Sequence, residues 1–464
     1  MSFLLLSAMI IIAVISFVIS ARPGGVNSFF KGWSQDDKVP HLITLTLSQV
    51  TTWIFARSLM TAAILGYYFG IVGGIAYAAY YLSFFTGAAI IDGVRFQHGF
   101  DNIQGFLEDR FGRYGVRCYN FVIALRLLSE VFANLLVIGI IFGETGSDAY
   151  IVAIVVLTLA TLAYSMIGGL RASLKTDVFQ MCVFAAVLVV IIFELTQADG
   201  WSVGAVLTSS PLKLESGWNL LLVALLQIWS YPLHDPVMMD RGFIADRRTT
   251  RLSFIHAGWI SIVCILSFSL LGVYAGLNTA DGEVMMTTLG RLLGEPVMTL
   301  ISLALIISAV STLDSTLSSA AKLSIVDMKL GRLSVGNGRI SMALFMLGGL
   351  AFLFGGSKDL YSAVAVSGTA SMFLIPVVFF SIWAGLSIPK WSYFASFVTA
   401  LGGAALYYVE AGGFYSLLEP ALGISIKYNK LLLISLTVLI LCISYFAIGL
   451  WLRRRAMSAD FARP

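Results

Sequence analysis

The sequence predicts an all-α integral membrane protein, and three observations lead to that prediction. The chain has 464 residues, of which 58% are hydrophobic and only 12% charged, with a mean hydropathy of +0.90. A soluble domain is nearer half apolar and a quarter charged. Apolar runs long enough to cross about 30 Å of hydrocarbon recur along the chain. One of these runs, residues 297–327, also carries a group of polar side chains at helical spacing.

Thirteen apolar runs are expected to form membrane helices. Their approximate ranges are 2–20, 42–66, 68–91, 117–143, 149–168, 175–197, 218–239, 252–277, 297–327, 338–356, 360–387, 391–409 and 430–452. The first run differs from a signal peptide, because it has no basic start and no convincing small-residue cleavage site after it. The four cysteines lie in or beside apolar runs, without the spacing of a metal site or a disulfide framework.

The distribution of cations predicts the orientation in the membrane. With the N-terminus outside and thirteen crossings, 21 of the 29 Lys and Arg residues fall on the inner side and 5 on the outer side, as the positive-inside rule requires. We therefore expect a multi-pass protein of the cell membrane with a cytoplasmic C-terminus. The basic inner loops follow from this topology, and they imply the lipid bilayer as partner and no nucleic acid. No nucleotide-binding motif or assembled catalytic set is recognisable, so we expect no enzyme.

The polar group in the run 297–327 predicts an ion site. Ser311, Thr312, Asp314 and Ser315 fall at offsets of 0, 1, 3 and 4, which places all four on one helix face. Polar and ionisable groups at membrane depth usually face a protein-lined or wet cavity. Hydroxyl and carboxylate oxygens suit a hard cation better than a soft metal.

Three segments resemble the sodium:solute symporters, the family of proline, sugar, pantothenate, sialic acid, urea and iodide carriers. Residues 168–180, GGLRASLKTDVFQ, are similar to a run that joins two helices in that family. The run from Ser308 to Ser319 is similar to the family's sodium-site helix. Residues 233–236, LHDP, followed by RGF at 241–243, resemble the segment that closes its seventh helix.

The resemblance implies a leucine-transporter-like fold with five-plus-five inverted repeats whose first helices are broken near the middle of the membrane. Within a single transporter domain, 1–464, we expect an extra N-terminal helix and cytoplasmic linker over 1–41, a first repeat over 42–239 and a second over 252–387. Two C-terminal helices and a short tail would fill 391–464. The polar cluster at 48–52 in the second helix is compatible with a break there.

The resemblance also implies a main sodium site. It would take hydroxyl oxygens from Ser311 and Thr312 and backbone carbonyls from Ser308, Leu47 and Val50. Alternatively, the two hydroxyls donate only to the carbonyls four residues earlier.

A second site for sodium or a proton would include Asp177, Asp314 and Ser315, where Asp314 replaces what is often a hydroxyl in the family. Two carboxylates near one cavity would strengthen a cation site, or one could hold a proton. Alternatively, Asp177 caps the sixth helix or pairs with Lys175 or Lys322.

The solute site implied by the resemblance lies between the second, third, seventh and eleventh helices. The candidates are Gln49, Trp53, Arg57, Gln227, Trp229, Tyr231 and Tyr361. Aromatic rings supply apolar walls there, and the amides supply hydrogen bonds. Arg57 could meet an anionic solute or belong to an outer gate. Arg126 and Glu130, at i and i+4, are expected to pair with each other for structural reasons.

These residues predict a secondary active transporter that couples inward sodium flow to the uptake of a small polar organic solute by alternating access. Sodium would be co-transported, without an organic cofactor. The alternative is a transporter-like membrane sensor that works with a separate signalling partner. The identity of the solute, the number of coupled ions and the oligomeric state stay open at this point.

Overall fold

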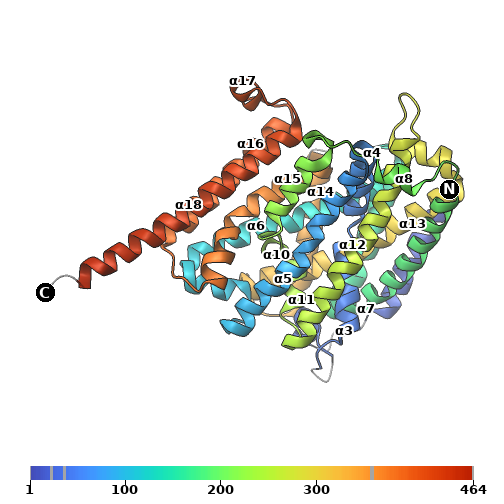
Figure 1. The fold of residues 1–464 in the computed structure, drawn as a ribbon. Helices are drawn as coiled ribbons and strands as arrows, with labels where there is room; N and C mark the ends of the chain where they lie inside the picture. Colours follow the sequence, from blue (N-terminus) through green and yellow to red (C-terminus); the bar gives the residue numbers. More distant parts are fainter. Residues whose placement is uncertain (1, 21–24, 35–37, 356–359, 462–464) are drawn as a thin grey trace.

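The computed structural model describes residues 2–20, 25–34, 38–355 and 360–461, and all regular structure within these ranges is helical. Figure 1 shows the helices gathered into one bundle, from which the last helix projects. The α-helices are α1 (Ser2–Ile19), α2 (Val26–Lys31), α3 (Leu42–Trp53), α4 (Ala56–Ala79), α5 (Ser83–Ile91), α6 (Ile103–Phe142), α7 (Asp148–Gln197), α8 (Val203–Leu207), α9 (Asn219–Gln227), α10 (Tyr231–His234), α11 (Pro236–Gly242), α12 (Arg247–Leu277), α13 (Met285–Lys322), α14 (Val335–Gly355), α15 (Leu360–Ser371), α16 (Lys390–Ala411), α17 (Leu418–Leu422) and α18 (Lys427–Phe461). Short 3₁₀ or π segments are η1 (Tyr80–Leu82), η2 (Asp92–Gln97), η3 (Leu214–Trp218), η4 (Leu323–Asp327), η5 (Met372–Leu374) and η6 (Val377–Trp383).

Four of the long helices contain a glycine in the left-handed region at a kink, and the others besides α4 and α7 are α6, at Gly112, and α13, at Gly294. Gly70 inside α4 has φ 64° and ψ −153°, and Gly169 inside α7 has φ 57° and ψ −145°. A side chain at such a φ is strained, so glycine is the residue that permits these turns. Gly70 lies close to the predicted boundary between the runs 42–66 and 68–91, and Gly169 lies close to the boundary between 149–168 and 175–197. In both cases the structure has one continuous helix with a kink where two separate helices were expected.

By length and composition, eight helices among the described residues could cross a membrane, and nine if the bent pair Ala365–Ser371 and Leu374–Trp383 counts as one span. This number is below the predicted thirteen in part because the helix Phe3–Ile19, from the first predicted run, is too short to count as a span. The span Asp148–Gln197 contains two predicted runs, and other predicted runs are interrupted into pieces too short to pass alone. The all-helical membrane architecture itself is confirmed.

Three predicted runs are interrupted in mid-course, and the last along the chain, 360–387, bends by 46° between Ala365–Ser371 and Leu374–Trp383. The run that begins at Leu42 breaks after Trp53 and resumes at Ala56, so the break expected in this helix is present. The predicted run 218–239 is divided into α9, α10 and α11, which together extend over 219–242. Pro232 and Pro236 stand at the first turns of α10 and α11, because proline lacks an N–H to continue the preceding helix but fits a helix start.

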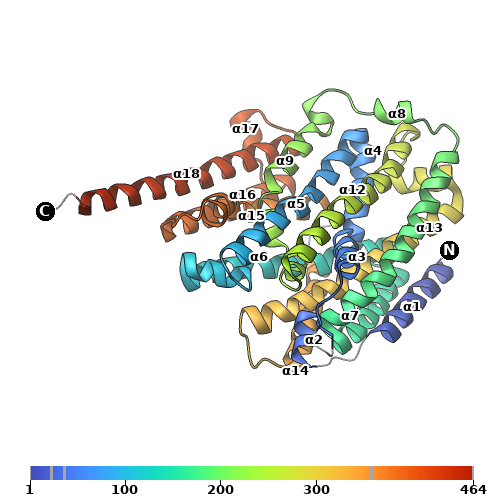
Figure 2. The ribbon, with the colours of Figure 1, turned by 60° about the horizontal axis from the view of Figure 1, so that its bottom comes forward.

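Three helices pack around the segment that precedes the break between α3 and α4. α3 packs against α12, α7 and α13, while α7 and α13 also pack on each other. In Figure 2, α1 lies along α7 at the edge of the bundle, and α16 and α18 lie beyond α15 at the opposite side. The interrupted helix α3–α4 therefore lies inside the bundle, where polar groups are shielded from lipid.

Candidate ion and solute sites

The interruption between α3 and α4 turns a backbone carbonyl toward α13. Ile54 follows α3 with φ −80° and ψ 63°, outside helical geometry. The buried Ser308 of α13 donates its hydroxyl proton to the Ile54 carbonyl oxygen. Carbonyls at a helix end lack their usual intrahelical partners, so they are available to hydroxyls or cations outside the helix.

A small cavity lies beside this contact, between α3, α7 and α13. Its volume is about 10 Å³, and its lining residues are Thr51, Ile54, Met181, Phe184, Ile307 and Ser308. A cavity of this size has room for about one water-sized sphere. The cavity therefore lies between the broken helix and α13, and it is large enough for a single small ion.

The residues expected to form the main sodium site only partly meet at this point. Thr312 donates its hydroxyl proton to the Ser308 carbonyl at 2.9 Å, which is the local bond considered as the alternative. Leu47 and Val50 lie in the regular part of α3, where the Val50 carbonyl accepts the Ile54 N–H at 3.0 Å. The carbonyl that contacts α13 belongs to Ile54, several residues further along than expected.

Asp177 of α7 is the centre of a buried polar cluster. Its Oδ1 accepts the Ser311 hydroxyl at 2.7 Å, and its Oδ2 accepts the Ser48 hydroxyl at 2.5 Å. Arg241 of α11 contacts the same Oδ2 at 3.2 Å. Ser311, expected in the main sodium site, therefore contacts Asp177, expected in the second site. Arg241 supplies a positive charge at the same carboxylate.

Asp314 of α13 lies next to this cluster and is fully buried. Its Oδ1 accepts hydroxyl protons from Ser173 at 2.8 Å and Ser315 at 3.2 Å, and its Oδ2 accepts one from Thr176 at 2.8 Å. The Ser173 and Ser315 hydroxyls also contact each other at 2.8 Å. The three residues predicted for a second site, Asp177, Asp314 and Ser315, are therefore in one network.

Arg241 itself is fully buried. Its Nε donates to the Ser48 hydroxyl at 2.8 Å, its Nη2 to Ser315 at 2.9 Å and its Nη1 to the Val237 carbonyl at 3.0 Å. The cationic partner of Asp177 is thus Arg241. Pairing of Asp177 with Lys175 or Lys322 is not found, because Lys175 is exposed and Lys322 bonds other carboxylates.

Four buried charges form a second network around the breaks. Glu130 of α6 accepts from Arg57 of α4 at 2.5 Å and also pairs with Arg126 one helical turn before it. Arg126 reaches on to Asp235, between α10 and α11, at 3.2 Å. The expected Arg126–Glu130 pair is present. Arg57, expected to face a solute or the outer gate, is held by Glu130, and the four charges balance.

Asp235 and His234 also stabilise the junction between α10 and α11. The Asp235 side chain accepts the Met238 N–H at 3.0 Å and so caps α11. The ring of His234 contacts the Tyr231 carbonyl at 2.9 Å and the Ser367 hydroxyl at 3.0 Å. These contacts agree with a helix-end role and link α10 to α15.

Two of the aromatic candidates for the solute site meet beside the first break. The rings of Trp53 and Tyr231 lie 5.6 Å apart, edge to face. Gln49 is buried one turn before Trp53, and its amide has no hydrogen-bond partner among the described residues. A buried unpaired amide is costly. The Gln49 amide can therefore form hydrogen bonds with a ligand next to the aromatic wall of Trp53 and Tyr231.

The remaining solute candidates are more scattered. Gln227 accepts from the Tyr80 hydroxyl at 2.9 Å, and the Tyr80 ring lies tilted at 5.4 Å from that of Tyr231. Trp229 instead packs on the rings of η6, with Phe379 at 5.4 Å. Tyr361 belongs to α15, but its side chain lies outside the described residues. Gln227 thus borders the Trp53–Tyr231 wall, whereas Trp229 belongs to a separate aromatic group.

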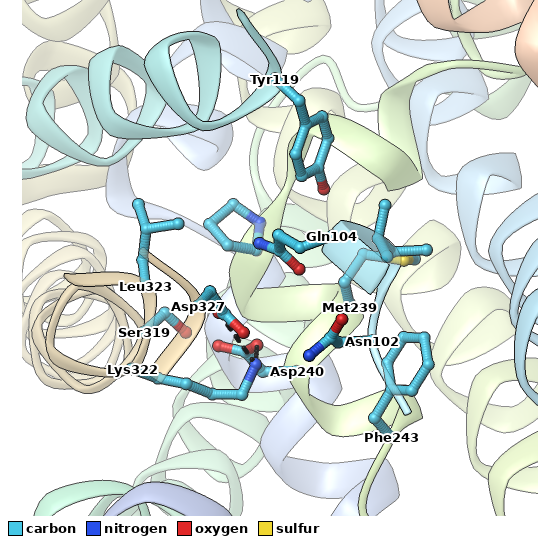
Figure 3. Close-up of a pocket in the computed structure, with 12 residues that line it drawn as sticks. Asn102, Gln104, Tyr119, Met239, Asp240, Phe243, Ser319, Lys322, Leu323 and Asp327 are labelled. Carbon is cyan, nitrogen blue, oxygen red and sulfur yellow. Dashed lines mark hydrogen bonds and ion pairs between the residues drawn. The ribbon is translucent and has the colours of Figure 1, made fainter. Parts of the chain in front are cut away.

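A second cavity lies further along α13, where Figure 3 shows the side chains that surround it. Its volume is about 20 Å³, and it is lined in part by Asn102, Tyr119 and Ser319. Lys322 bonds Asp240 of α11 at 2.6 Å and Asp327 of η4 at 3.3 Å beside it. These ion pairs tie the last of the three segments from the 219–242 run to the end of α13.

Sequence reasoning missed Arg241 and Ile54 as members of the central site. Arg241 was counted among the inner-side cations, although it belongs to the RGF run that supports the family resemblance. The burial of its side chain depends on the break at Asp235, which hydropathy does not reveal. Ile54 has no side-chain signal at all, because only its carbonyl takes part.

No protein-family model matches the chain. Over 151 residues, 32% of the chain, it is 30% identical to a urea active transporter of Saccharomyces cerevisiae (strain ATCC 204508 / S288c), of which the match covers 20%. Over 233 residues, 46% of the chain, it is 26% identical to the high-affinity proline transporter PutP of Bacillus subtilis (strain 168), of which the match covers 49%. The chain thus matches less than half the length of either relative.

Among solved structures, a substrate-bound, outward-open Na⁺-coupled sialic acid symporter aligns with a TM-score of 0.68 at 14% identity. The alignment covers 96% of this chain and 97% of that one. At this identity the likeness concerns the fold, and it extends over nearly the whole chain. The expected leucine-transporter-like fold is confirmed.

Proposed function

We propose that this member of the sodium:solute symporter family is a secondary active transporter that couples the inward flow of sodium to the uptake of a small polar organic solute. The observation that supports the proposal most directly is the contact of the Ser308 hydroxyl with the carbonyl at the helix break. Interrupted helices in such folds offer backbone carbonyls to a cation at the membrane midplane. The relatives described as urea, proline and sialic acid carriers agree with this class of activity.

The main sodium site is proposed at the junction of α3, α4 and α13. Ser308, Ser311 and Thr312 would provide oxygens from α13, and Ile54 would replace Leu47 and Val50 as the principal carbonyl donor from the broken helix. Neutral oxygens of this kind suit sodium. Ser311 now bonds Asp177, so sodium binding would reorient its hydroxyl. The small cavity beside Ile54 is where the ion would enter the junction.

The solute site is proposed beside the same break. Trp53 and Tyr231 would supply the apolar wall, with Gln49 and Gln227 as hydrogen-bonding groups. Because Arg57 is paired with Glu130, its role would be to hold the outer half of the broken helix, with direct solute contact a secondary role. Ions and solute that share one broken helix can stabilise the same conformation, which is what coupling requires.

Asp177, Asp314 and Ser315 form the second candidate cation centre, and Arg241 takes part in it. For the whole chain we propose two inverted repeats. The second break, in the run 219–242, favours a start of the second repeat near Asn219 rather than at 252, because the broken helix opens each repeat in this fold. We also propose the cell membrane as location, with the N-terminus outside.

A membrane sensor with a separate signalling partner is the second candidate function. It would use the same ion and solute sites, so the two proposals differ only in whether the solute crosses the membrane. Uptake into proteoliposomes separates them. Radiolabelled urea, L-proline and sialic acid are offered in turn, with an inward gradient of either sodium or potassium.

We expect accumulation of at least one of these solutes in sodium only, enhanced by an inside-negative potential. Sodium-dependent binding without accumulation would support the sensor. Uptake that is equal in the two salts would contradict sodium coupling.

A further inference from the structure

Arg241 lies among the side chains of the second candidate cation centre. Its Nη2 lies 3.2 Å from the Asp177 carboxylate and 2.9 Å from the Ser315 hydroxyl, and its Nε lies 2.8 Å from the Ser48 hydroxyl. These oxygens come from α7, α13 and α3, and all four side chains are at most 1% exposed. The guanidinium is therefore enclosed by the same oxygens that would coordinate a small ion.

All three nitrogens of this guanidinium donate hydrogen bonds to the groups around it. Its Nη1 donates to the Val237 carbonyl one turn earlier in α11 at 3.0 Å, and none of its nitrogens is without a partner in the described part of the chain. Arginine is always charged and is the preferred side chain for buried ion pairs. A sodium ion at Asp177 would have to displace these bonds and bear the repulsion of a like charge in a buried site.

The neighbouring carboxylate, Asp314, is also hydrogen-bonded on both of its oxygens. The Asp314 oxygens accept from Ser173, Thr176 and Ser315 at 2.8 to 3.2 Å. Ser315 is shared between Asp314 and Arg241, so a cation at Asp314 would also compete with the guanidinium for that hydroxyl.

We propose that Arg241 is a tethered cation that replaces a second sodium ion at Asp177, so that one sodium ion, at the main site, binds in each cycle. This inference rests on the proposed sodium coupling. Because Arg241 belongs to α11, the tethered charge moves with the inner part of the second broken run. The adjacent Asp240 binds Lys322 of α13 (Figure 3), so one ion pair joins α11 to α13 and a second, between Arg241 and Asp177, joins α11 to α7.

The test counts sodium ions on the purified full-length protein in detergent, with ²²Na⁺ as probe. Wild type, Arg241→Gln and the charge-balanced double variant Asp177→Asn/Arg241→Gln are compared at saturating ²²Na⁺. The sodium dependence of thermal stability gives an independent Hill slope for each. We expect one ion and a slope near 1 for wild type. We expect two ions and a steeper slope for Arg241→Gln, because Asp177 is then open, and one ion again for the double variant.

Two sodium ions on the wild type would overturn the inference, whatever the variants do. A folded Arg241→Gln protein that still binds one ion would also overturn it. If Arg241→Gln folds only in high sodium, while the double variant folds equally well in potassium, the result supports the inference, because sodium then takes the place of the lost charge. If Arg241→Gln does not fold even in high sodium while the double variant folds in potassium, sodium cannot replace the guanidinium and the inference fails. No sodium on the wild type at all would instead refute the proposed function.

Discussion

At the scale of single residues, Glu130 is the group on which two buried cations depend. It accepts from Arg57 at 2.5 Å and pairs with Arg126 on its own helix. Removing one partner of a buried ion pair leaves an uncompensated charge and costs about 3–5 kcal/mol. We therefore expect Glu130→Gln to lower the free energy of unfolding by that amount, as measured by SDS titration in mixed micelles.

The control for this substitution keeps the charges balanced. In Arg57→Gln/Glu130→Gln, the pair between Arg126 and Asp235 remains, so most of the lost stability should return. A Glu130→Gln protein that unfolds like wild type would show that the network contributes little to the fold.

Helical spacing correctly grouped three of the four polar side chains of α13, whereas the Thr312 hydroxyl bonds the Ser308 carbonyl of its own helix. Ser311, Asp314 and Ser315 all reach the Asp177 network, as their offsets indicate. The partners from other helices could not be predicted in this way. Arg241 enters through a break in its own helical run, and Ile54 takes part through its carbonyl, which no side-chain pattern reports.

At the scale of helices, the turn at Gly70 divides α4 in two. Its φ of 64° is unfavourable for other residues, and an added Cβ would approach the carbonyl and hydroxyl of Ser209 to 2.6 Å. A non-glycine residue in left-handed geometry costs about 1–2 kcal/mol. We expect Gly70→Ala to lower the thermal stability measured in detergent by at least that amount.

Gly402 is the matched control for Gly70. It lies within α16, and an added Cβ there would meet nothing within 4 Å. Alanine in a helix interior is favoured over glycine by about 0.5–1 kcal/mol, so Gly402→Ala should be neutral or stabilising. Equal effects of the two substitutions would argue against a strained turn at Gly70.

An ion pair between Glu283, which lies between the candidate spans, and Arg291 of α13 holds the connection between α12 and α13. The Glu283 carboxylate receives two bonds from Arg291, both at 2.8 Å. These hydrogen bonds lower the pKa of Glu283 from 4.5 to about 2. The stability from this pair is present above pH 4.5 and is lost as the pH falls toward 2, because the unfolded carboxylate takes up its proton first.

This ion pair predicts a specific pH dependence. Between pH 6 and pH 3, the thermal midpoint of wild type should fall more steeply than that of Glu283→Gln, which has no proton to gain at this position. Parallel curves would show that Glu283 does not contribute to acid sensitivity.

Hydropathy predicted where helices lie better than where they bend. The runs that became α12, α14 and α16 agree with their predicted ranges within about five residues at each end. The interruption of the 219–242 run follows from Pro232 and Pro236, which hydropathy does not weigh. The turns at Gly70 and Gly169 depend on backbone angles that many other glycines of the chain do not adopt.

At the scale of the whole molecule, the cation distribution predicts the side on which each loop lies. Lys213 is expected outside and Lys329 inside, and both are exposed. In a background without Cys118, Cys182, Cys264 and Cys442, a membrane-impermeant maleimide should label Lys213→Cys on intact cells. It should label Lys329→Cys only after the membrane is opened. The reverse pattern would invert the proposed orientation.

The central claim is that sodium binds where the broken helix meets α13. The most direct test compares the thermal stability of the purified protein in sodium and in potassium at equal ionic strength, for wild type, Thr312→Ala and Ser318→Ala. A ligand at about a hundred times its Kd stabilises the folded state by about 2.7 kcal/mol. Ser318 is the control, because its hydroxyl also bonds the carbonyl four residues earlier, at 2.9 Å, but further along the helix.

We predict stabilisation of wild type and Ser318→Ala by sodium only. Thr312→Ala should need about tenfold more sodium for the same effect, because the loss of about 1.4 kcal/mol of binding free energy is a tenfold change in affinity. Equal stability of the wild type in the two salts would contradict the account.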